Sequence, residues 1–394
     1  MADCHLGSWS NHPDLKDYSI IAFERAIDQC IDEGVDFIII AGDLFDTSIP
    51  PIDVLRRCAA KLRQLKERNI GVYVISGSHD YSPSGKTMLS VLEDSGLLVD
   101  VFKYEDSGEK IRLKFAEDAK TGAKFTGIMG RKGSLELSFY KRLDKSVIDE
   151  PGKKIFLFHA GIEDRNFAGG DMHISAGDLP GGFVYYAAGH IHKQYFDPER
   201  RIVFPGELFP TSFDELENYN GGFVIAKIDG DSFGIERKSV RLFDVVLMKI
   251  DAENKSPLAV EKEITEKMEK TDINGKVLLL KLRGILDGRI SDINFNSIAA
   301  AAEQSGALIV KKSLSAVSTK EMDDIAARPA QSTDAIEREM IRECSESLRL
   351  QRIADTESLV SNIMSVMEEE KMEDETNATF EARLKANAKK VFGL

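Results

Sequence analysis

Short apolar runs alternate with amphipathic stretches along the first 230 residues. Residues 15–34 place apolar side chains three or four positions apart and end at a glycine, which predicts a helix packed on a core. The β-branched run at 35–41 follows directly and is typical of a strand covered on both faces. The pattern then repeats, with helices expected at 51–69 and 86–95 and strands at 70–75, 154–158, 184–188, 202–204 and 223–228. This βα repetition predicts an α/β fold.

The pattern changes along the rest of the chain. Residues 97–140 are polar and irregular, and we expect short antiparallel strands and loops there. From 240 to 320 three apolar runs alternate with two helical stretches and contain no histidine or cysteine, which predicts a small α+β domain without the chemistry. Beyond 331 the chain is charged and helix-prone, with an apolar stripe over 378–392. We therefore expect domains at 1–235 and 240–320 and a helical tail at 331–394.

Composition narrows the class of protein. The four cysteines of the 394 residues have no paired spacing, so neither disulfides nor a thiolate metal site is indicated. No apolar run could span a membrane and no signal peptide is evident, which favours a cytoplasmic protein. The net charge of −14 disfavours nucleic-acid binding by the whole surface but permits a local basic groove.

The candidate chemistry is an ordered series of histidines and aspartates. Five of the seven histidines join it. Asp43, His79, His159 and His190 each lie one to four residues past the end of an expected strand, where open α/β sheets bind their ligands. The members are Asp3, His5, Asp43, His79, Asp80, His159, His190 and His192.

This series suits a hydrolase with two divalent cations, which needs one carboxylate to bridge the ions and imidazoles or carboxylates around each. Asp43 follows a rigid strand and an adjacent glycine, so it fits the bridge. Asp3 with His5, and His190 with His192, can each present two side chains to one cavity, and His159 completes the set. Nitrogen and oxygen ligands suit Mn²⁺, Fe²⁺ or Zn²⁺, and the residues do not choose among them.

His79 differs from the ligands because it belongs to a Gly-Ser-His-Asp turn. We expect it to donate a proton to the departing alkoxide of a phosphate ester. Asp80 is expected to orient that imidazole and raise its pKa. Asp46 fits two roles, either support behind a metal ligand or the cap of the helix that begins near Pro50.

The series resembles the signature of the calcineurin-like metallophosphoesterases. Within them, the motifs GDLFDTSIPP, FHAGI and GHIH resemble the Mre-eleven/SbcD subunits of the DNA double-strand-break repair nuclease. The resemblance implies a β-sandwich flanked by helices, a DNA-capping domain and a tail that binds a Rad-fifty/SbcC-type ATPase. It also implies two Mn²⁺ ions, a homodimer formed through helices 15–34 and 51–69, and His79 as the catalytic histidine. One ion would be held by Asp3, His5, Asp43 and His192, and the other by Asp43, Ser78, His159 and His190.

Two departures from that family are visible. Ser78 stands where the family has asparagine, so a shorter hydroxyl replaces a carboxamide ligand and the second ion should bind more weakly. Asp3 follows only Met1 and Ala2, where the family has a strand. We expect a shortened start, a mobile terminus carrying two ligands, and lower metal affinity than in a form extended at its N-terminus.

Three functions remain in view. The first is a Mn²⁺-dependent DNA nuclease for break repair, with 3′–5′ double-strand exonuclease and single-strand endonuclease activity. The second is a phosphodiesterase for small substrates such as cyclic nucleotides or nucleotides, against which the additional domain and tail argue. The third is a catalytically weak DNA-binding scaffold for the ATPase, favoured only by Ser78 and the short start.

Overall fold

The computed structural model describes residues 1–82, 85, 87–131, 136–163, 173–230, 232–320, 342, 356–367, 369 and 377–391. The chain divides into two compact units. The first comprises Met1–Ile250, Glu261–Leu282 and Asn294–Ser315, and the second comprises Asp251–Val260, Arg283–Ile293 and Ala316–Leu394. The domain boundaries expected from the sequence stay a prediction.

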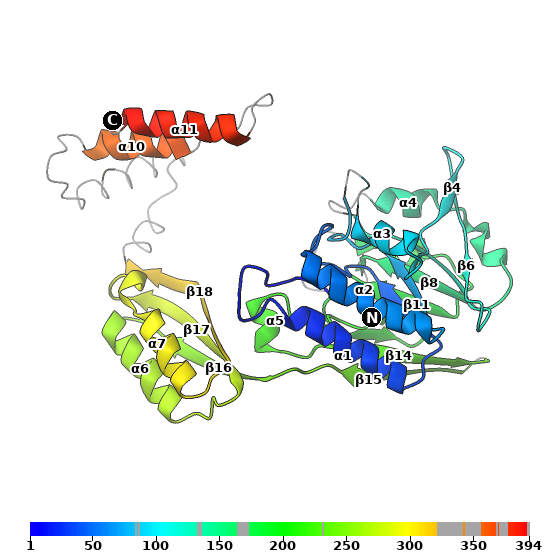
Figure 1. Cartoon of the computed structure of the whole chain (residues 1–394), viewed down its shortest axis with the longest axis horizontal. Coiled ribbons are helices and arrows are strands. Elements are labelled where there is room, and N and C mark those ends of the chain that lie inside the picture. The colour runs from blue at the N-terminus through cyan, green and yellow to red at the C-terminus, as the bar shows by residue number, and fades with distance from the viewer. Residues whose placement is uncertain are drawn as a thin grey trace. The chain divides into compact units, whose positions relative to one another are not determined.

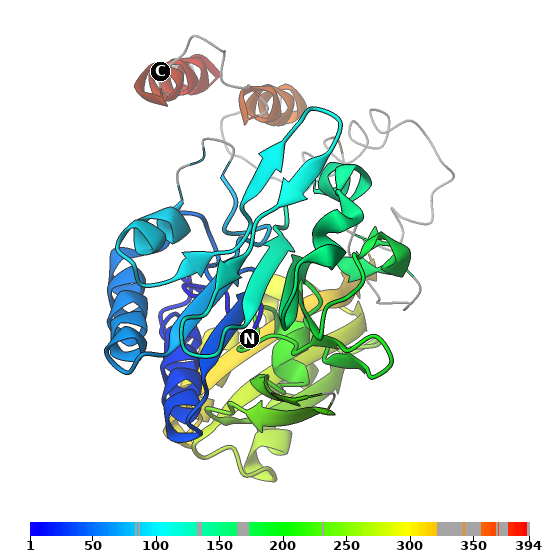
Figure 2. The ribbon, with the colours of Figure 1, turned by 90° about the vertical axis from the view of Figure 1, so that its right-hand side faces the viewer.

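The first sheet of the first unit is built from the N-terminal βα repeats. Three parallel strands lie in the order β1-β2-β3, with bounds Phe37–Ala41, Gly71–Ile75 and Val99–Asp100. The helices α1 (Tyr18–Asp32) and α2 (Ile52–Glu67) lie side by side along this sheet (Figure 1, Figure 2), and the short α3 (Met88–Asp94) precedes β3. The apolar stripe of α1 is buried as its spacing predicts, with Phe23 and Ile27 fully covered.

A six-stranded sheet forms the second layer of the fold. Its order is β12-β13-β11-β8-β7-β6, with bounds Tyr195–Asp197, Ile202–Phe204, Tyr185–Gly189, Lys154–His159, Lys124–Ile128 and Ala116–Glu117. The strands β7, β8 and β11 are parallel, and Gly189 lies opposite His159. The sequence did not predict β7 as a parallel strand. Its run, KFTGI, is short and includes a glycine whose added Cβ would come 2.3 Å from the Leu157 carbonyl oxygen.

Aromatic side chains join the two sheets. Tyr73 of β2 stacks on Phe125 of β7 with ring centroids 3.9 Å apart, and Phe37 of β1 meets Phe125 edge-on at 4.9 Å. Phe125 is fully buried, so contacts of this kind bury large apolar areas between the sheets. The fold is therefore the helix-flanked β-sandwich that the resemblance implied.

The remaining short elements of the first 240 residues lie around this sandwich. The hairpin β4-β5 (Tyr104–Asp106, Ile111–Leu113) is one of the antiparallel pairs expected in the irregular region. A longer hairpin joins β14 (Gly222–Asp229) to β15 (Ser232–Ser239), and β15 was not predicted because its sequence is mostly polar. The others are α4 (Leu137–Arg142), η2 (Lys145–Asp149), β9 (Gly161–Ile162), β10 (His173–Ile174), η4 (Ala176–Asp178) and α5 (Phe213–Glu217).

The elements after residue 240 follow the predicted order. A sheet of order β16-β17-β18 has bounds Asp244–Asp251, Lys276–Leu286 and Ile309–Thr319. Between its strands come α6 (Pro257–Glu269), η5 (Ile290–Asp292) and α7 (Phe295–Gln304), and the tail contains α10 (Thr356–Met367) and α11 (Asn377–Val391). Most of the acidic run at 368–375 lies outside the described residues. Among the helices that are described, none has both the length and the apolar character needed to cross a membrane.

Candidate metal centre

The expected ligands and the expected acid, His79, come from both sheets and meet at the carboxyl ends of their strands. Asp43 follows β1 and His79 follows β2, whereas His159 ends β8 and His190 and His192 follow β11. This convergence is what the parallel arrangement of these strands requires. Four segments that are far apart in the sequence thereby reach one site.

Residues at the chain start also join this site. The backbone N–H of Asp3 donates to the carbonyl of Gly42 at 3.1 Å, and Leu6 forms a parallel bridge with Phe45. Asp3 is fully buried and His5 is 3% exposed. The loosely held terminus that we expected is therefore not what the structure shows, because backbone hydrogen bonds fix these two ligands beside the loop after β1.

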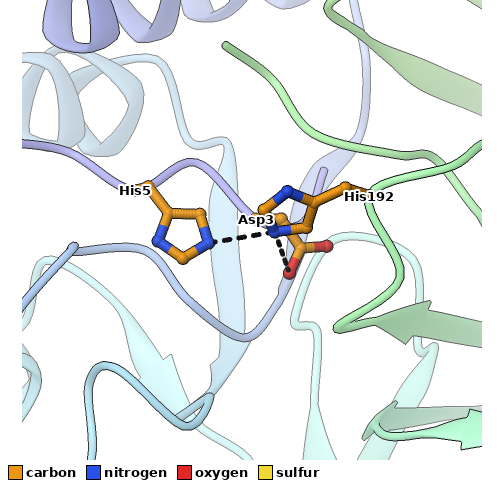
Figure 3. Close-up of side chains that lie close together, drawn as sticks. All are labelled: Asp3, His5 and His192. Atoms are coloured by element: carbon orange, nitrogen blue, oxygen red, sulfur yellow. Dashed lines mark hydrogen bonds and ion pairs between the residues drawn. The ribbon is translucent and has the colours of Figure 1, made fainter. Parts of the chain in front are cut away.

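One group of candidate ligands consists of Asp3, His5 and His192, whose side chains point toward one another (Figure 3). The Nε2 atoms of His5 and His192 lie 3.2 Å apart, and Nε2 of His192 lies 4.0 Å from Oδ1 of Asp3. The other ring nitrogens of both histidines face carboxylates, which leaves the two Nε2 atoms to face each other. Two imidazole nitrogens and a buried carboxylate oxygen converging in this way fit a divalent cation.

Asp43 connects this group to a second one. Its Oδ1 accepts a hydrogen bond from the backbone N–H of His79 at 2.8 Å. Its Oδ2 lies 3.7 Å from Nε2 of His5, 3.1 Å from Nε2 of His159 and 3.5 Å from the Ser78 hydroxyl. One carboxylate oxygen thus faces ligands of both groups, the position that a bridging carboxylate needs.

His159 gives a direct test of whether a cation fits. Its Nδ1 lies 2.9 Å from the Ala41 carbonyl, to which it donates, so the neutral ring carries its lone pair on Nε2. That Nε2 is buried and makes no hydrogen bond although Oδ2 of Asp43 is close. Burial lowers the pKa of His159, but the carboxylates of Asp43 and Asp3 outweigh it and raise the pKa to about 10. The site therefore attracts positive charge, which a divalent cation would supply.

The second group is Asp3, Asp43 and His159, whose ligand atoms converge, and His190 packs beside His159. The two rings meet edge-on with centroids 5.3 Å apart, and the backbone N–H of His190 donates to Asp3 at 3.0 Å. Glycine makes this packing possible. A Cβ on Gly189 would lie 2.0 Å from the Ala41 carbonyl oxygen and 2.7 Å from Nδ1 of His159.

Four of the candidate ligands have an unusual backbone conformation. The φ angles are 50° at Asp3, 42° at His5, 50° at Asp43 and 83° at His190. They are half of the eight non-glycine residues with positive φ in the described part of the chain. Such conformations cost about 1 kcal/mol or more each and gather at functional sites. The strain supports a functional role for these positions.

The turn that contains His79 differs from what the sequence predicted. The Asp80 carboxylate accepts hydrogen bonds from the backbone amides of Leu44, Phe45 and Gly77 at 2.9 to 3.1 Å. His79 is instead held by Asp46, whose carbonyl oxygen lies 2.8 Å from Nδ1. The prediction that Asp80 orients His79 is therefore wrong, because buried amides of the neighbouring loop engage its carboxylate.

Asp46 has the supporting role that was one of its two predicted roles. Its Oδ1 lies 3.2 Å from Nδ1 of His5, while its carbonyl holds His79. Helix α2 begins at Ile52 with Pro51 as its N-cap, so Asp46 does not cap it. One residue consequently orients both a candidate ligand and the candidate acid.

Sequence reasoning missed Glu215. Its Oε1 lies 2.8 Å from Nδ1 of His192, and its Oε2 accepts hydrogen bonds from Thr211 and Ser212. Burial raises the pKa of Glu215, but the hydrogen bond and charge of His192 outweigh it and lower the pKa to about 2. The Ser-x-x-Glu spacing at 212–215 signals a helix start, but nothing in it indicates contact with a histidine 23 residues away.

Comparison with known proteins agrees with this site. Residues 1–194 match the family described as Calcineurin-like phosphoesterase. The chain is 28% identical over 296 residues to the DNA double-strand break repair protein Mre11 of Sulfolobus acidocaldarius, covering 72% of this chain and 74% of the relative. It is 31% identical over 260 residues to the protein of that name from Methanococcus maripaludis, covering 62% and 66%. The Thermoplasma acidophilum protein of that name is 29% identical and covers 64% and 68%.

Proposed function

We propose that this protein is a metal-dependent DNA nuclease that acts in double-strand break repair. The observation that carries the proposal is the position of Asp43 Oδ2 between two groups of buried ligands on a phosphoesterase fold. The relatives named for DNA double-strand break repair support DNA as the substrate. By the same resemblance we propose 3′–5′ exonuclease action on duplexes and endonuclease action on single strands.

The residues divide into two sets that would hold two Mn²⁺ ions. Asp3, His5, Asp43 and His192 form the first set, and Asp43, Ser78, His159 and His190 form the second. Two bound divalent cations supply charge stabilisation for a phosphate and lower the pKa of an attacking water. Fe²⁺ and Zn²⁺ suit the same nitrogen and oxygen donors. The Ser78 hydroxyl is on a shorter side chain than the asparagine of the family, so the second set should bind its cation more weakly than the first.

The imidazole of His79 is suited to proton donation. The Asp46 carbonyl accepts from Nδ1 at 2.8 Å, which fixes the ring and leaves Nε2 for the substrate. The side chain is 42% exposed, whereas His5, whose ring it meets edge-on at 4.7 Å, is buried. Donation therefore requires the imidazolium form, which carries a proton on each nitrogen. When the P–O bond breaks, the imidazolium gives its Nε2 proton to the departing alkoxide oxygen and becomes the neutral ring that keeps its proton on Nδ1. Asp46 thus holds His79 beside the ligands, while the His79 ring remains accessible to a long substrate.

The other parts of the chain are assigned by the same proposal. The α+β region after residue 240 would cap DNA at the site, and the tail would bind a Rad-fifty/SbcC-type ATPase. Helices α1 and α2 would form a homodimer. Deleting residues 376–394, which include α11, should leave nuclease activity intact and abolish co-purification with the ATPase; retained co-purification would refute the tail assignment.

The nuclease assignment is tested by incubating purified protein and Mn²⁺ with labelled duplex DNA, single-stranded DNA and cyclic nucleotides. His79→Ala serves as the inactive control. DNA digestion that the variant loses supports the proposal. Hydrolysis restricted to the small diesters would indicate a small-substrate phosphodiesterase, and DNA binding without cleavage by either protein would indicate a scaffold.

A further inference from the structure

Glu215 contacts a candidate metal ligand from a helix that carries no ligand of its own. It is the third residue of α5, and its Oε1 lies 2.8 Å from Nδ1 of His192. A carboxylate oxygen only accepts hydrogen bonds, so Nδ1 of His192 must carry the proton. The lone pair of the neutral ring is then on Nε2, the atom that faces His5 and Asp3.

The carboxylate itself is fixed by its other oxygen. Oε2 accepts from the backbone N–H of Thr211 at 2.7 Å, the Thr211 hydroxyl at 3.0 Å and the backbone N–H of Ser212 at 3.2 Å. The Ser212 hydroxyl completes a capping box by accepting from the backbone N–H of Glu215. Two backbone donors on Oε2 prevent the group from turning, which leaves Oε1 directed at His192.

We infer that Glu215 is a positioning residue that sets the tautomer of His192 and so makes Nε2 a metal ligand. This inference rests on the proposed metal site but concerns cation binding, which is measured separately from DNA cleavage. Partners behind a metal-bound histidine act in this way in other metalloproteins, and their loss typically weakens metal binding about 10- to 100-fold. Glu215 thereby belongs to the half of the site formed by Asp3, His5 and His192.

The geometry predicts which of two variants, Glu215→Gln or Glu215→Ala, loses more affinity for the cation. In Glu215→Gln the two backbone amides at the Oε2 position require an acceptor, so the amide oxygen must lie there. The amide NH₂ then faces Nδ1 of His192 and donates to it, which moves the ring proton to Nε2 and removes the lone pair. Glu215→Ala leaves Nδ1 free to bond to water, so His192 can still adopt the binding tautomer. A role limited to helix capping would give the opposite ranking, because glutamine also forms capping boxes.

The experiment measures Mn²⁺ affinity and stoichiometry by titration calorimetry, and thermal unfolding of the metal-free proteins. We expect Glu215→Gln to lower the affinity for one of the two Mn²⁺ ions about 10- to 100-fold, a loss at least as large as that in Glu215→Ala. The metal-free Glu215→Gln protein should nevertheless unfold at a higher temperature than metal-free Glu215→Ala. Asp214→Asn is the matched control, since Asp214 lies on the same helix, is 83% exposed and pairs with Lys281. It should bind both ions like the unaltered protein.

Other outcomes would overturn the inference. Unchanged binding of both ions by Glu215→Gln would show that Glu215 does not set the tautomer. If Glu215→Ala had both the lower Mn²⁺ affinity and the lower unfolding temperature of the two variants, Glu215 would have a role in helix capping alone. Normal cation binding without DNA cleavage by the unaltered protein would instead contradict the nuclease proposal and leave this inference standing.

Discussion

Oδ2 of the Asp43 carboxylate lies 3.1 Å from Nε2 of His159, and both side chains are almost completely buried. The same oxygen also faces His5, so removing it should affect both halves of the site. We expect Asp43→Ala to lose both cations, with a greater loss than the roughly 10- to 100-fold caused by removing a group behind a ligand. Elemental analysis after gel filtration measures this directly. Retention of two Mn²⁺ per chain would refute the bridging assignment.

His79→Ala should separate catalysis from cation binding. The ring of His79 is partly exposed and is held through a backbone carbonyl rather than through a ligand carboxylate. We expect this variant to bind two cations normally and to cleave DNA about 10²- to 10⁴-fold more slowly, the range for loss of a general acid. Single-turnover cleavage with saturating Mn²⁺ checks the rate, and calorimetry checks the binding. A variant that lost a cation instead would place His79 among the ligands.

Gly189→Ala should damage the site through steric clash. The added methyl group would lie 2.0 Å from the Ala41 carbonyl oxygen and close to the His159 ring. Overpacking of this kind costs about 1 to 3 kcal/mol, and we expect a lower unfolding temperature together with weaker cation binding. Gly234→Ala is the control, because no atom lies within 4 Å of the position that an added Cβ would take and its φ is not positive. Equal stability of the two variants would contradict the close packing at this strand end.

Asp118 should contribute a pH-dependent part of the stability at a distance from the metal ligands. Burial raises the pKa of its carboxyl, but hydrogen bonds from Thr121 and Tyr73, each 2.8 Å long, outweigh it and leave the pKa below its ordinary value of 3.8. A carboxyl with a lowered folded pKa stabilises fully above the ordinary value. That contribution is lost as the pH falls through the folded value.

Asp118→Asn tests this contribution. At pH 7 the variant should be about 1.5 to 3 kcal/mol less stable, the range for hydrogen bonds to a charged group. The difference should shrink as the pH falls below about 4, the ordinary value for an aspartate. Urea unfolding of the metal-free proteins at several pH values measures it. A difference that stays constant down to the most acidic pH at which the proteins remain folded would show that the charge of Asp118 does not stabilise the fold.

The sequence predicted the parts of the fold that have strong local signals. Buried β-branched runs and amphipathic helices fell within a few residues of their predicted positions, as for α1 and β1. Strand β7 was missed because its short mixed run acquires its identity only by pairing with β8. Strand β15 was missed because only Phe233 and Ile235 of its eight residues are apolar, which is too short an alternation to stand out.

In the site, too, features with a local sequence signal were predicted and features set by tertiary contacts were not. Ligand types at strand ends were visible because their positions repeat along the chain. The partner of each polar group was not visible, since Asp80 could equally well bond to the neighbouring imidazole or to distant backbone amides. Its contacts with Leu44 and Phe45 depend on how two loops meet in three dimensions. Glu215 was missed for the same reason, because its contact with His192 is tertiary.

The two sheets of the sandwich contribute different ligands, and this has a consequence for folding. Asp43 follows a strand of the first sheet, whereas His159 ends a strand of the second sheet and His190 and His192 follow another. Contacts between residues so distant in sequence form late and slowly. Each proposed cation needs Asp43 together with at least one histidine of the second sheet, so it can be captured at full strength only once the sheets have come together. Its uptake during refolding would therefore report when the sandwich closes, independently of when the helices and individual strands appear.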